Sequence, residues 1–304
     1  MNEVATRAPS SRVMMVLRDI KLAHSVFALP FAVLSAFLAR DAEDPTSKFA
    51  MQLVLVVWCM IAARTFAMVV NRVADIRWDA ANPRTARRAF AVGVLSKRDG
   101  VVALLICGAL FVAGAAGFGV LFSNWWPAML AMPVLGWVAL YSFTKRFTIL
   151  CHLFLGGALA ASPIAAALAV RPESLVEIAA VWWFAGMVAF WVAGFDVIYA
   201  LQDLDFDRSA KLHSVPARFG VSGAAWISRG LHALAFACLV MAWQADDRLE
   251  LLTAAAVALI GVLLIAEHVV LHRRGKAGLE MAFFTINGIV SCVLGVLGSI
   301  DLMV

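Results

Sequence analysis

Long apolar blocks, separated by short polar segments, run through almost the whole chain. Each block approaches the roughly 20 residues that an α-helix needs to cross the hydrocarbon core of a bilayer. The pattern predicts an all-α integral membrane protein with about nine transmembrane helices. The predicted spans cover residues 22–39, 50–71, 100–122, 126–143, 149–169, 176–199, 222–243, 251–270 and 281–300.

Composition agrees with this prediction. Of the 304 residues, 63% are apolar and 15% are charged, whereas soluble domains are nearer half apolar and a quarter charged. Arg18, Asp19, Lys21 and His24 interrupt what would have to be the apolar region of a cleavable signal peptide. We therefore interpret residues 1–304 as one polytopic membrane domain, which starts with a cytoplasmic segment at residues 1–20.

Lys and Arg lie mostly on one side of the predicted topology. With the N-terminus in the cytoplasm, the inner segments hold 19 of the 25 Lys and Arg residues and the outer segments hold four. Positive charge retained in the cytoplasm sets the orientation of membrane proteins. The basic residues behind the net charge of +5 thus mark the cytoplasmic side of a protein in a cell (inner) membrane, and they do not indicate nucleic-acid binding. It places the long polar segments 72–99 and 200–221 in the cytoplasm.

Two aspartate clusters repeat each other at the inner ends of the second and sixth spans. The first reads Asn71-Arg-Val-Ala-Asp75-Ile-Arg-Trp-Asp79, and the second reads Tyr199-Ala-Leu-Gln-Asp203-Leu-Asp-Phe-Asp207. Asp75 and Asp203 are 128 residues apart, as are Asp79 and Asp207. This register predicts an internal pseudo-repeat that brings both clusters to the same membrane depth.

Helical geometry predicts which of these carboxylates converge. Asp75 and Asp79 lie one turn apart and share a helix face. Three acids of the second cluster fall within about 40° of one another, with Tyr199 about 60° away and a fourth acid on the opposite side. The convergent acids are Asp196, Asp203 and Asp207, and the divergent one is Asp205.

Carboxylates that border hydrocarbon need a cation or another partner. Mg²⁺ binds one or two carboxylates and completes its coordination with waters and substrate phosphate oxygens. We therefore predict that Asp75, Asp79, Asp203 and Asp207 are catalytic residues that bind Mg²⁺. The alternative is that they cap helices or pair with nearby arginines, which explains one cluster more readily than two in register.

Basic residues lie near the aspartate clusters or at the ends of other spans. Arg88 lies in the polar segment after the first cluster, and Lys145 and Arg146 end the fourth span. Arginine binds phosphate oxygens in a bidentate manner and lysine acts as a compact charge, so these residues are candidates for a polyanionic substrate. Arg64 precedes Asn71 by two helical turns, roughly 10 Å deeper. At that depth it needs a protein-lined cavity and a partner, or a structural ion pair.

Together these motifs resemble the UbiA family of membrane prenyltransferases. The family motif N-D-x-x-D-x-x-x-D is matched from Asn71 to Asp79, with Arg72 in place of its second-position Asp. The motif D-x-x-Y-x-x-x-D-x-x-x-D is matched from Asp196 to Asp207. The similarity covers about residues 20–220 and includes three further segments: Arg84–Arg88, Tyr141–Arg146 and Lys211–Gly220.

The resemblance implies a nine-span bundle and a Mg²⁺-dependent aromatic polyprenyltransferase. The donor would be an allylic polyprenyl diphosphate, and the acceptor ring of a hydroxylated aromatic acid would attack the allylic carbocation in a water-poor cavity. Besides the four aspartates, the expected substrate-binding residues are Arg64 (for the acceptor carboxylate), Asn71, Arg88, Lys145, Arg146, Asp196 and Tyr199.

The acceptor stays open at this point. Tyr141–Arg146 is similar to the 4-hydroxybenzoate polyprenyltransferase branch, which serves ubiquinone biosynthesis. Lys21-x-x-His24-Ser-x-Phe27-x-x-Pro30-Phe31 resembles enzymes of a menaquinone route that prenylate a dihydroxynaphthoate.

Two other classes are less consistent with the sequence. Transporters place acidic sites near the bilayer midplane, whereas these clusters lie at the ends of spans. CDP-alcohol phosphatidyltransferases place Gly after an early Asp and keep their acids close together, unlike this chain.

Overall fold

The computed structural model describes Met15, residues 27–279 and residues 281–304. The N-terminal segment 1–20 (apart from Met15) and residues 22–26 of the first predicted span lie outside the described residues. Every regular element in the described part is helical. The elements are α2 (Leu29–Ala39), α3 (Thr46–Ala74), α4 (Ile76–Ala81), α5 (Lys97–Phe122), α6 (Trp126–Thr144), α7 (Cys151–Val170), α8 (Ser174–Glu177), α9 (Ala179–Tyr199), η2 (Ala200–Asp203), α10 (Leu204–Ser209), α11 (Val215–Gln244), α12 (Leu251–Arg274), η3 (Gly275–Gly278), the π-helical η4 (Met281–Ile286) and α13 (Asn287–Asp301).

Within these residues, eight helices are long and apolar enough to cross a membrane. They correspond to the second to ninth predicted spans. The described portion of the first predicted span forms the shorter apolar helix α2, which has 11 residues. The all-helical membrane architecture is confirmed, with one short helix and eight long ones in the part of the chain that is described.

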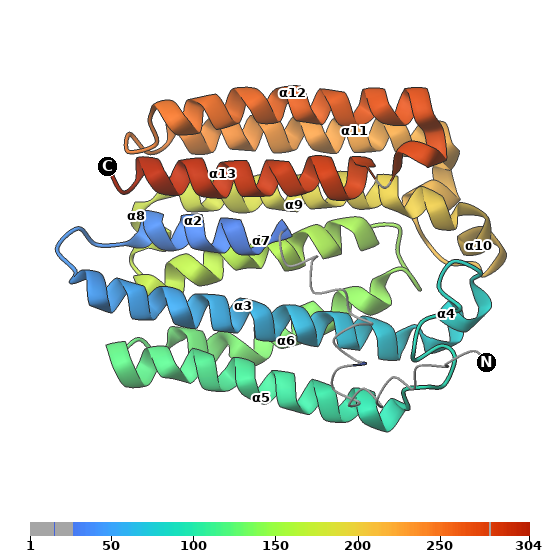
Figure 1. Cartoon of the computed structure of the whole chain (residues 1–304), viewed down its shortest axis with the longest axis horizontal. Coiled ribbons are helices and arrows are strands. Elements are labelled where there is room, and N and C mark those ends of the chain that lie inside the picture. The colour runs from blue at the N-terminus through green and yellow to red at the C-terminus, as the bar shows by residue number, and fades with distance from the viewer. Residues whose placement is uncertain (1–14, 16–26, 280) are drawn as a thin grey trace, which may run out of the picture.

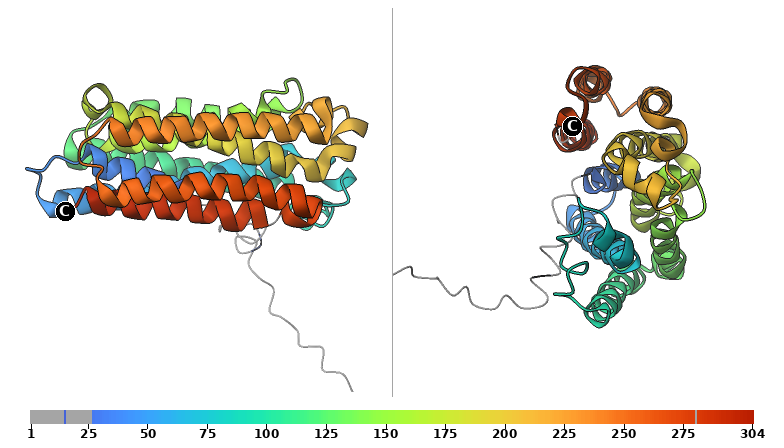
Figure 2. Two further views of the ribbon diagram at one scale, coloured as in Figure 1. Left: turned by 90° about the horizontal axis from the view of Figure 1, so that it is seen from above. Right: turned by 90° about the vertical axis from the view of Figure 1, so that its right-hand side faces the viewer.

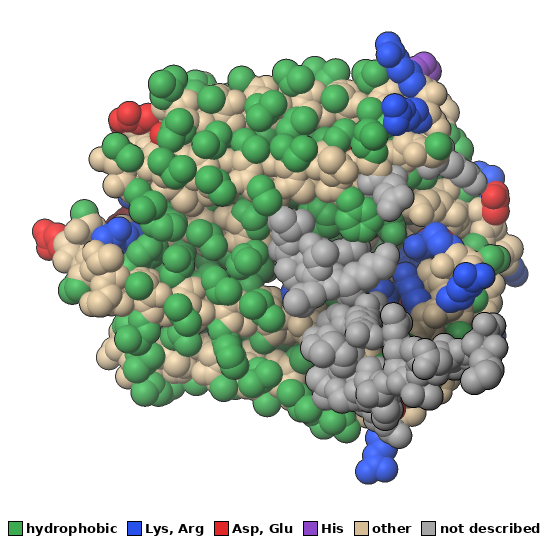
Figure 3. Space-filling view, in the orientation of Figure 1, with side chains coloured by type: hydrophobic (Ala, Val, Ile, Leu, Met, Phe, Trp, Pro, Cys, Tyr) green, Lys and Arg blue, Asp and Glu red, His purple; other side chains and the backbone are tan. Residues whose placement is uncertain are grey.

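The buried centre of the bundle is α9, which runs between its neighbours along the long axis (Figures 1 and 2). It packs against α7 on one side and α11 on the other. Phe184, Val188 and Trp191 of α9 are completely buried. The outer surface of the bundle instead exposes apolar side chains over much of its length (Figure 3). Such a broad apolar surface is typical of a protein that contacts lipid.

Both aspartate clusters lie where a long helix breaks into a short one. Asp75 joins α3 to α4 with φ −98° and ψ 8°, and Asp203 joins η2 to α10 with φ −102° and ψ 7°. The two junctions therefore have the same backbone conformation, 128 residues apart. Figure 1 shows α4 and α10 at one end of the bundle and the C-terminus at the other. That arrangement agrees with the predicted topology, in which the clusters and the C-terminus face opposite sides.

The polar segment after α4 is fixed at its far end by a capping box. The Ser96 hydroxyl accepts a hydrogen bond from the Asp99 N–H (3.2 Å), and the Asp99 carboxylate accepts one from the Ser96 N–H (2.9 Å). These bonds satisfy backbone donors that the first turn of α5 leaves free. The capping box thus fixes where the polar segment ends and α5 begins.

Candidate active site

A polar cavity of about 260 Å³ opens at the end of the bundle that carries α4 and α10. It is lined from two halves of the chain: α3, α4 and the segment after them, and the region from the end of α6 to Ser214. The lining includes all four predicted metal ligands and most of the predicted substrate-binding residues. These are Asp75, Asp79, Asp203 and Asp207, with Arg64, Asn71, Arg88, Lys145, Asp196 and Tyr199.

The helix breaks turn the carboxylates into this cavity. Asp75 still donates its N–H to the Asn71 carbonyl (3.0 Å), and Asn71 donates a side-chain hydrogen bond to the Asp75 carboxylate (3.4 Å). Asp79 and Asp207, one turn after each break, are both buried. Asp205 is exposed and does not line the cavity, as the helical wheel predicts.

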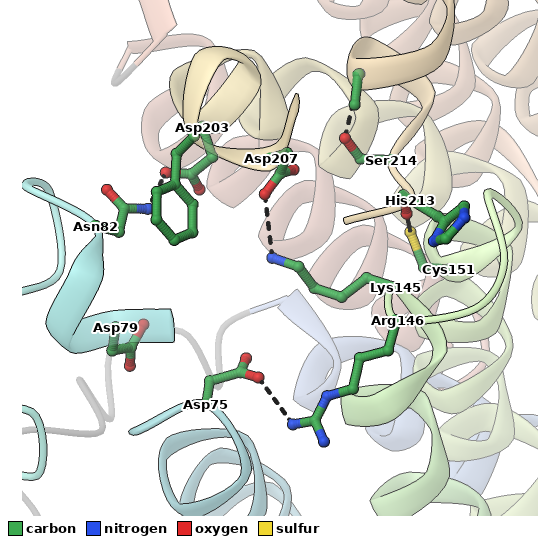
Figure 4. Close-up of polar contacts among 12 residues, drawn as sticks. Asp75, Asp79, Asn82, Lys145, Arg146, Cys151, Asp203, Asp207, His213 and Ser214 are labelled. Atoms are coloured by element: carbon green, nitrogen blue, oxygen red, sulfur yellow. Dashed lines mark hydrogen bonds and ion pairs between the residues drawn. The ribbon is translucent and has the colours of Figure 1, made fainter. Parts of the chain in front are cut away.

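Each of the four carboxylates pairs with a different cation, and three of the cations come from distant parts of the chain. Figure 4 shows two of these pairs, with Arg146 on Asp75 and Lys145 on Asp207. None of the pairs joins adjacent residues, so the local arginines of the alternative interpretation are not the partners. The four pairs are Asp75–Arg146 (3.2 Å), Asp79–Arg88 (2.8 Å), Asp203–Arg84 (2.5 Å) and Asp207–Lys145 (3.6 Å).

Burial and charge act against each other at these groups. Burial raises the pKa of Asp75, and the nearby charges of Lys145 and Arg146 only partly offset this. Burial alone would lower the pKa of Lys145, but the carboxylates of Asp207 and Asp75 outweigh it and hold that pKa above its ordinary value. Lys145 therefore carries its charge at neutral pH.

Arg146 differs from the other predicted substrate-binding residues because it does not line the cavity. It donates to the Ala74 carbonyl (2.7 Å) and to Asp75 (3.2 Å), and its guanidinium lies 4.3 Å from the ring centre of Trp78. These contacts clamp the junction between α3 and α4. Its role in substrate binding stays a prediction, and its observed contacts are those of a positioning residue.

Two residues complete the Asp203 environment: Asn82, which the sequence analysis did not single out, and Arg84, which it named only within the Arg84–Arg88 segment. Asn82 donates to Asp203 Oδ1 (2.8 Å) and accepts from the Arg84 N–H (3.0 Å). Arg84 donates from Nε and Nη2 to both oxygens of Asp203 (2.8 and 2.5 Å). The Asn82-Pro83 dipeptide after the first cluster is the sequence signal, because Asn favours such turns and Pro prevents the helix from continuing.

His152 is another residue that the sequence analysis missed. Its Nε2 accepts a hydrogen bond from the Val215 N–H (3.2 Å), which leaves the proton on Nδ1 to be donated to Asp196 (2.7 Å). The histidine thus ties α7 to α9 and to the start of α11, and it orients Asp196 toward the cavity. Its signal is a lone histidine within an apolar span, where a buried carboxylate needs a donor.

A second, apolar cavity of about 260 Å³ adjoins the polar one and shares Arg64, Tyr141 and Leu159 with it. The remainder of its lining is almost wholly Ala, Val, Leu, Met and Phe from α3, α5, α6 and α7. Among the described residues, Arg64 has no carboxylate partner. The guanidinium therefore stands at the boundary between a polar and an apolar chamber, with its charge available to a ligand.

The four carboxylates are the type of ligand that binds a hard cation. Carboxylate oxygens are the ligands that Mg²⁺ prefers, and Asp207 Oδ1 is buried without a hydrogen-bond partner within the described chain. In that same part, no group of three or more Asp, Glu, His or Cys side chains is close enough to hold an ion. The carboxylates face their own cations instead, so metal binding would require them to turn toward one another.

Comparisons with known proteins agree with this architecture. The sequence model of the UbiA prenyltransferase family matches residues 28–289. A 4-hydroxybenzoate octaprenyltransferase of Alcanivorax borkumensis is 34% identical over 183 residues, which cover 60% of this chain and 60% of that protein.

Solved structures share the fold. The apo structure of a UbiA homolog from Aeropyrum pernix K1 has a TM-score of 0.81 at 30% identity, covering 93% of this chain and 99% of that one. A UbiA homolog from Archaeoglobus fulgidus, bound to GPP and Mg²⁺, has a TM-score of 0.70 at 18% identity, covering 95% and 100%. Because the family match extends over most of the chain, this multi-pass membrane protein belongs to the UbiA prenyltransferase family.

Proposed function

We propose that the protein transfers a polyprenyl group from an allylic polyprenyl diphosphate to a hydroxylated aromatic acid of the 4-hydroxybenzoate type, in respiratory quinone biosynthesis. The observation that carries the proposal is the junction of two chambers at Arg64. A chamber of paired carboxylates and cations there meets an apolar chamber. The name of the Alcanivorax relative supports the choice of acceptor.

The polar chamber would bind the diphosphate head group. Arg84, Arg88 and Lys145 line it and provide charge-assisted hydrogen bonds to phosphate oxygens. The four carboxylates of Asp75, Asp79, Asp203 and Asp207 would hold Mg²⁺, as their oxygen donors and the Mg²⁺-bound Archaeoglobus homolog suggest. When bound, Mg²⁺ neutralises the charge that builds on the diphosphate as the allylic C–O bond breaks.

The apolar chamber would receive the isoprenoid tail. Its wall combines small residues such as Ala63 and Ala115 with larger ones such as Phe111 and Phe118. Burial of the tail there excludes water from the reacting carbon, which matters because water would otherwise capture the carbocation. Phe195 and Tyr199 line the polar chamber and can face that positive charge with their rings.

We assign acceptor binding to Arg64 and Asp196, with His152 as the residue that positions Asp196. Arg64 would hold the carboxylate of the aromatic acid, and Asp196 would accept a hydrogen bond from its phenolic hydroxyl. The bond from His152 keeps Asp196 oriented for that contact. The allylic C–O bond breaks and releases diphosphate, the ring carbon next to the hydroxyl attacks the allylic carbocation, and this ring carbon then loses its proton to the released diphosphate. We place these steps on the cytoplasmic side of the inner membrane.

The proposal is tested with purified protein in detergent, a polyprenyl diphosphate, Mg²⁺ and either 4-hydroxybenzoate or a dihydroxynaphthoate. Mass spectrometry should detect the prenylated hydroxybenzoate, and EDTA should abolish its formation until Mg²⁺ is restored. A prenylated naphthoate alone would move the protein to menaquinone biosynthesis. Absence of any covalent product, with uptake of an acid into proteoliposomes, would indicate a transporter.

A matched pair of variants tests the site. Asp203→Asn removes one cavity carboxylate and should lower kcat/KM about a thousandfold, a loss of roughly 4 kcal/mol that is typical of a group stabilising transition-state charge. Asp205→Asn makes the same chemical change two residues away on an exposed side chain and should leave kcat/KM within about twofold. Equal effects of the two substitutions would contradict the assignment of Asp203.

A further inference from the structure

A second, unrelated set of cavities lies between α11 and α12. Two chambers of about 720 and 630 Å³ are lined mainly by residues of these helices, the smaller one also by Ile198, Leu201, Gly275 and Leu279. They meet at Arg229, His268 and His272, which line both. None of their lining residues lines the polar cavity. We call the two chambers together the α11/α12 groove, and it is separate from the candidate active site.

The groove is basic at one end. Arg229 and Arg273 both line its larger chamber, and in the part of the chain that the structure describes no Asp or Glu lines either chamber. The guanidinium of Arg229 lies 4.7 Å from the ring centre of Trp226, and within the described residues it forms no ion pair with a carboxylate. An arginine within a membrane span requires a partner. No carboxylate of the described residues lies here, so an external anion would complete the contact.

The remainder of the groove is apolar and faces outward. Phe236, Leu264 and Val269 line it, and Ile265 is 68% exposed. His272 and Arg273 lie in the last turn of α12. Lys, Arg and His side chains gather there, at the end of the bundle that carries the candidate active site (Figure 3). A site with a cationic end and a long apolar wall on a membrane-facing surface matches an amphiphile with an anionic head.

We propose that the α11/α12 groove binds an anionic phospholipid. Arg229 and Arg273 would hold its phosphodiester, because guanidinium groups match phosphate oxygens in a bidentate manner. His268 and His272 lie beside them, and the His268 ring is held by a hydrogen bond between its Nε2 and Nδ1 of His232 (3.1 Å). The acyl chains would lie against the apolar wall between the two helices. This site is independent of the proposed prenyl transfer.

The test is native mass spectrometry of the full chain in detergent, titrated with phosphatidylglycerol or with phosphatidylcholine of the same acyl chains. Wild type should bind phosphatidylglycerol more tightly than phosphatidylcholine. Arg229→Gln and Arg273→Gln should each weaken phosphatidylglycerol binding roughly tenfold, as expected for loss of one charge-assisted contact. Arg274→Gln is the matched control, since Arg274 is adjacent and exposed but lines neither chamber. It should change binding less than twofold.

Three results would overturn the proposal. The first is equal loss in Arg273→Gln and Arg274→Gln, which would indicate diffuse attraction to a basic surface. The second is equal affinity of wild type for the two lipids. The third is full displacement of phosphatidylglycerol by inorganic phosphate, which would make the groove a site for a free anion. Size-exclusion chromatography and melting temperature monitor folding, and if Arg229→Gln does not fold, the Arg273 and Arg274 pair decides.

Discussion

Replacement of Arg64 by Met tests whether the boundary between the two chambers recognises the acceptor carboxylate. Met keeps a long apolar side chain and removes the charge. The structure places no carboxylate of the described chain against this guanidinium, so the charge is free to serve the ligand. A charge-assisted hydrogen bond contributes about 1.5–3 kcal/mol, which corresponds to about a 10- to 150-fold rise in the KM for 4-hydroxybenzoate. The KM for the polyprenyl diphosphate should change less than about twofold.

A substrate without the carboxylate makes this prediction specific. Wild type should prefer 4-hydroxybenzoate over phenol, and Arg64→Met should lose most of that preference because it no longer binds the group by which the two differ. Steady-state kinetics with both acceptors measures the coupling between the guanidinium and the carboxylate. An unchanged KM for 4-hydroxybenzoate, or an equal loss with phenol, would refute the assignment. The melting temperature should not fall, since the half-buried Arg64 has no carboxylate partner within the described residues to lose.

Two further predictions concern stability. The pKa of Lys145 is raised, so the stability that its charge adds should be complete below pH 10.5 and be lost as the pH rises through the raised pKa. The melting temperatures of wild type and Lys145→Met should therefore differ below pH 10.5 and converge above the raised pKa. A constant difference would contradict the charge argument. A Cβ atom on Gly156 would collide with the Ala189 carbonyl oxygen across the α7–α9 contact. Gly156→Ala should therefore destabilise by about 1–3 kcal/mol, whereas Gly136→Ala, with nothing within 4 Å, should not lower the melting temperature.

The membrane fold and the presence of both acid clusters in one cavity could be predicted because each depends on a repeated local pattern. Blocks of about 20 apolar residues permit few alternatives to spanning helices. The 128-residue register of the aspartates predicts two equivalent helix ends, and Asp75 and Asp203 indeed share a backbone conformation. Even the divergence of Asp205 followed from helical angles, because α10 keeps one turn of helix through that position.

Side-chain pairing could not be predicted in the same way. Two arginines lie within two residues of a cluster aspartate without pairing with it: Arg77 is exposed and forms no ion pair within the described residues, and Arg208 donates to the Ala217 carbonyl. Neighbouring residues on a helix point in different directions and rarely meet. The actual partner of Asp203 is 119 residues away in a segment without long helices. His152 was missed for the same reason, since its partners lie 44 and 63 residues away.

The pairing of four acids with four bases explains how one end of a membrane bundle can hold so many charges. Buried charges are costly unless each has a partner of opposite sign, and here each cation shields one carboxylate. The pairs are unequal: Arg84 makes two hydrogen bonds to Asp203, whereas Lys145 stays 3.6 Å from Asp207 and leaves its buried Oδ1 without a hydrogen bond. A ligand that brings both an anion for the lysine and a cation for this carboxylate would therefore gain the most binding free energy at the Lys145–Asp207 pair. A metal-bound diphosphate has both charges, which is why this chemistry fits the cavity better than a simple anion or a lone cation.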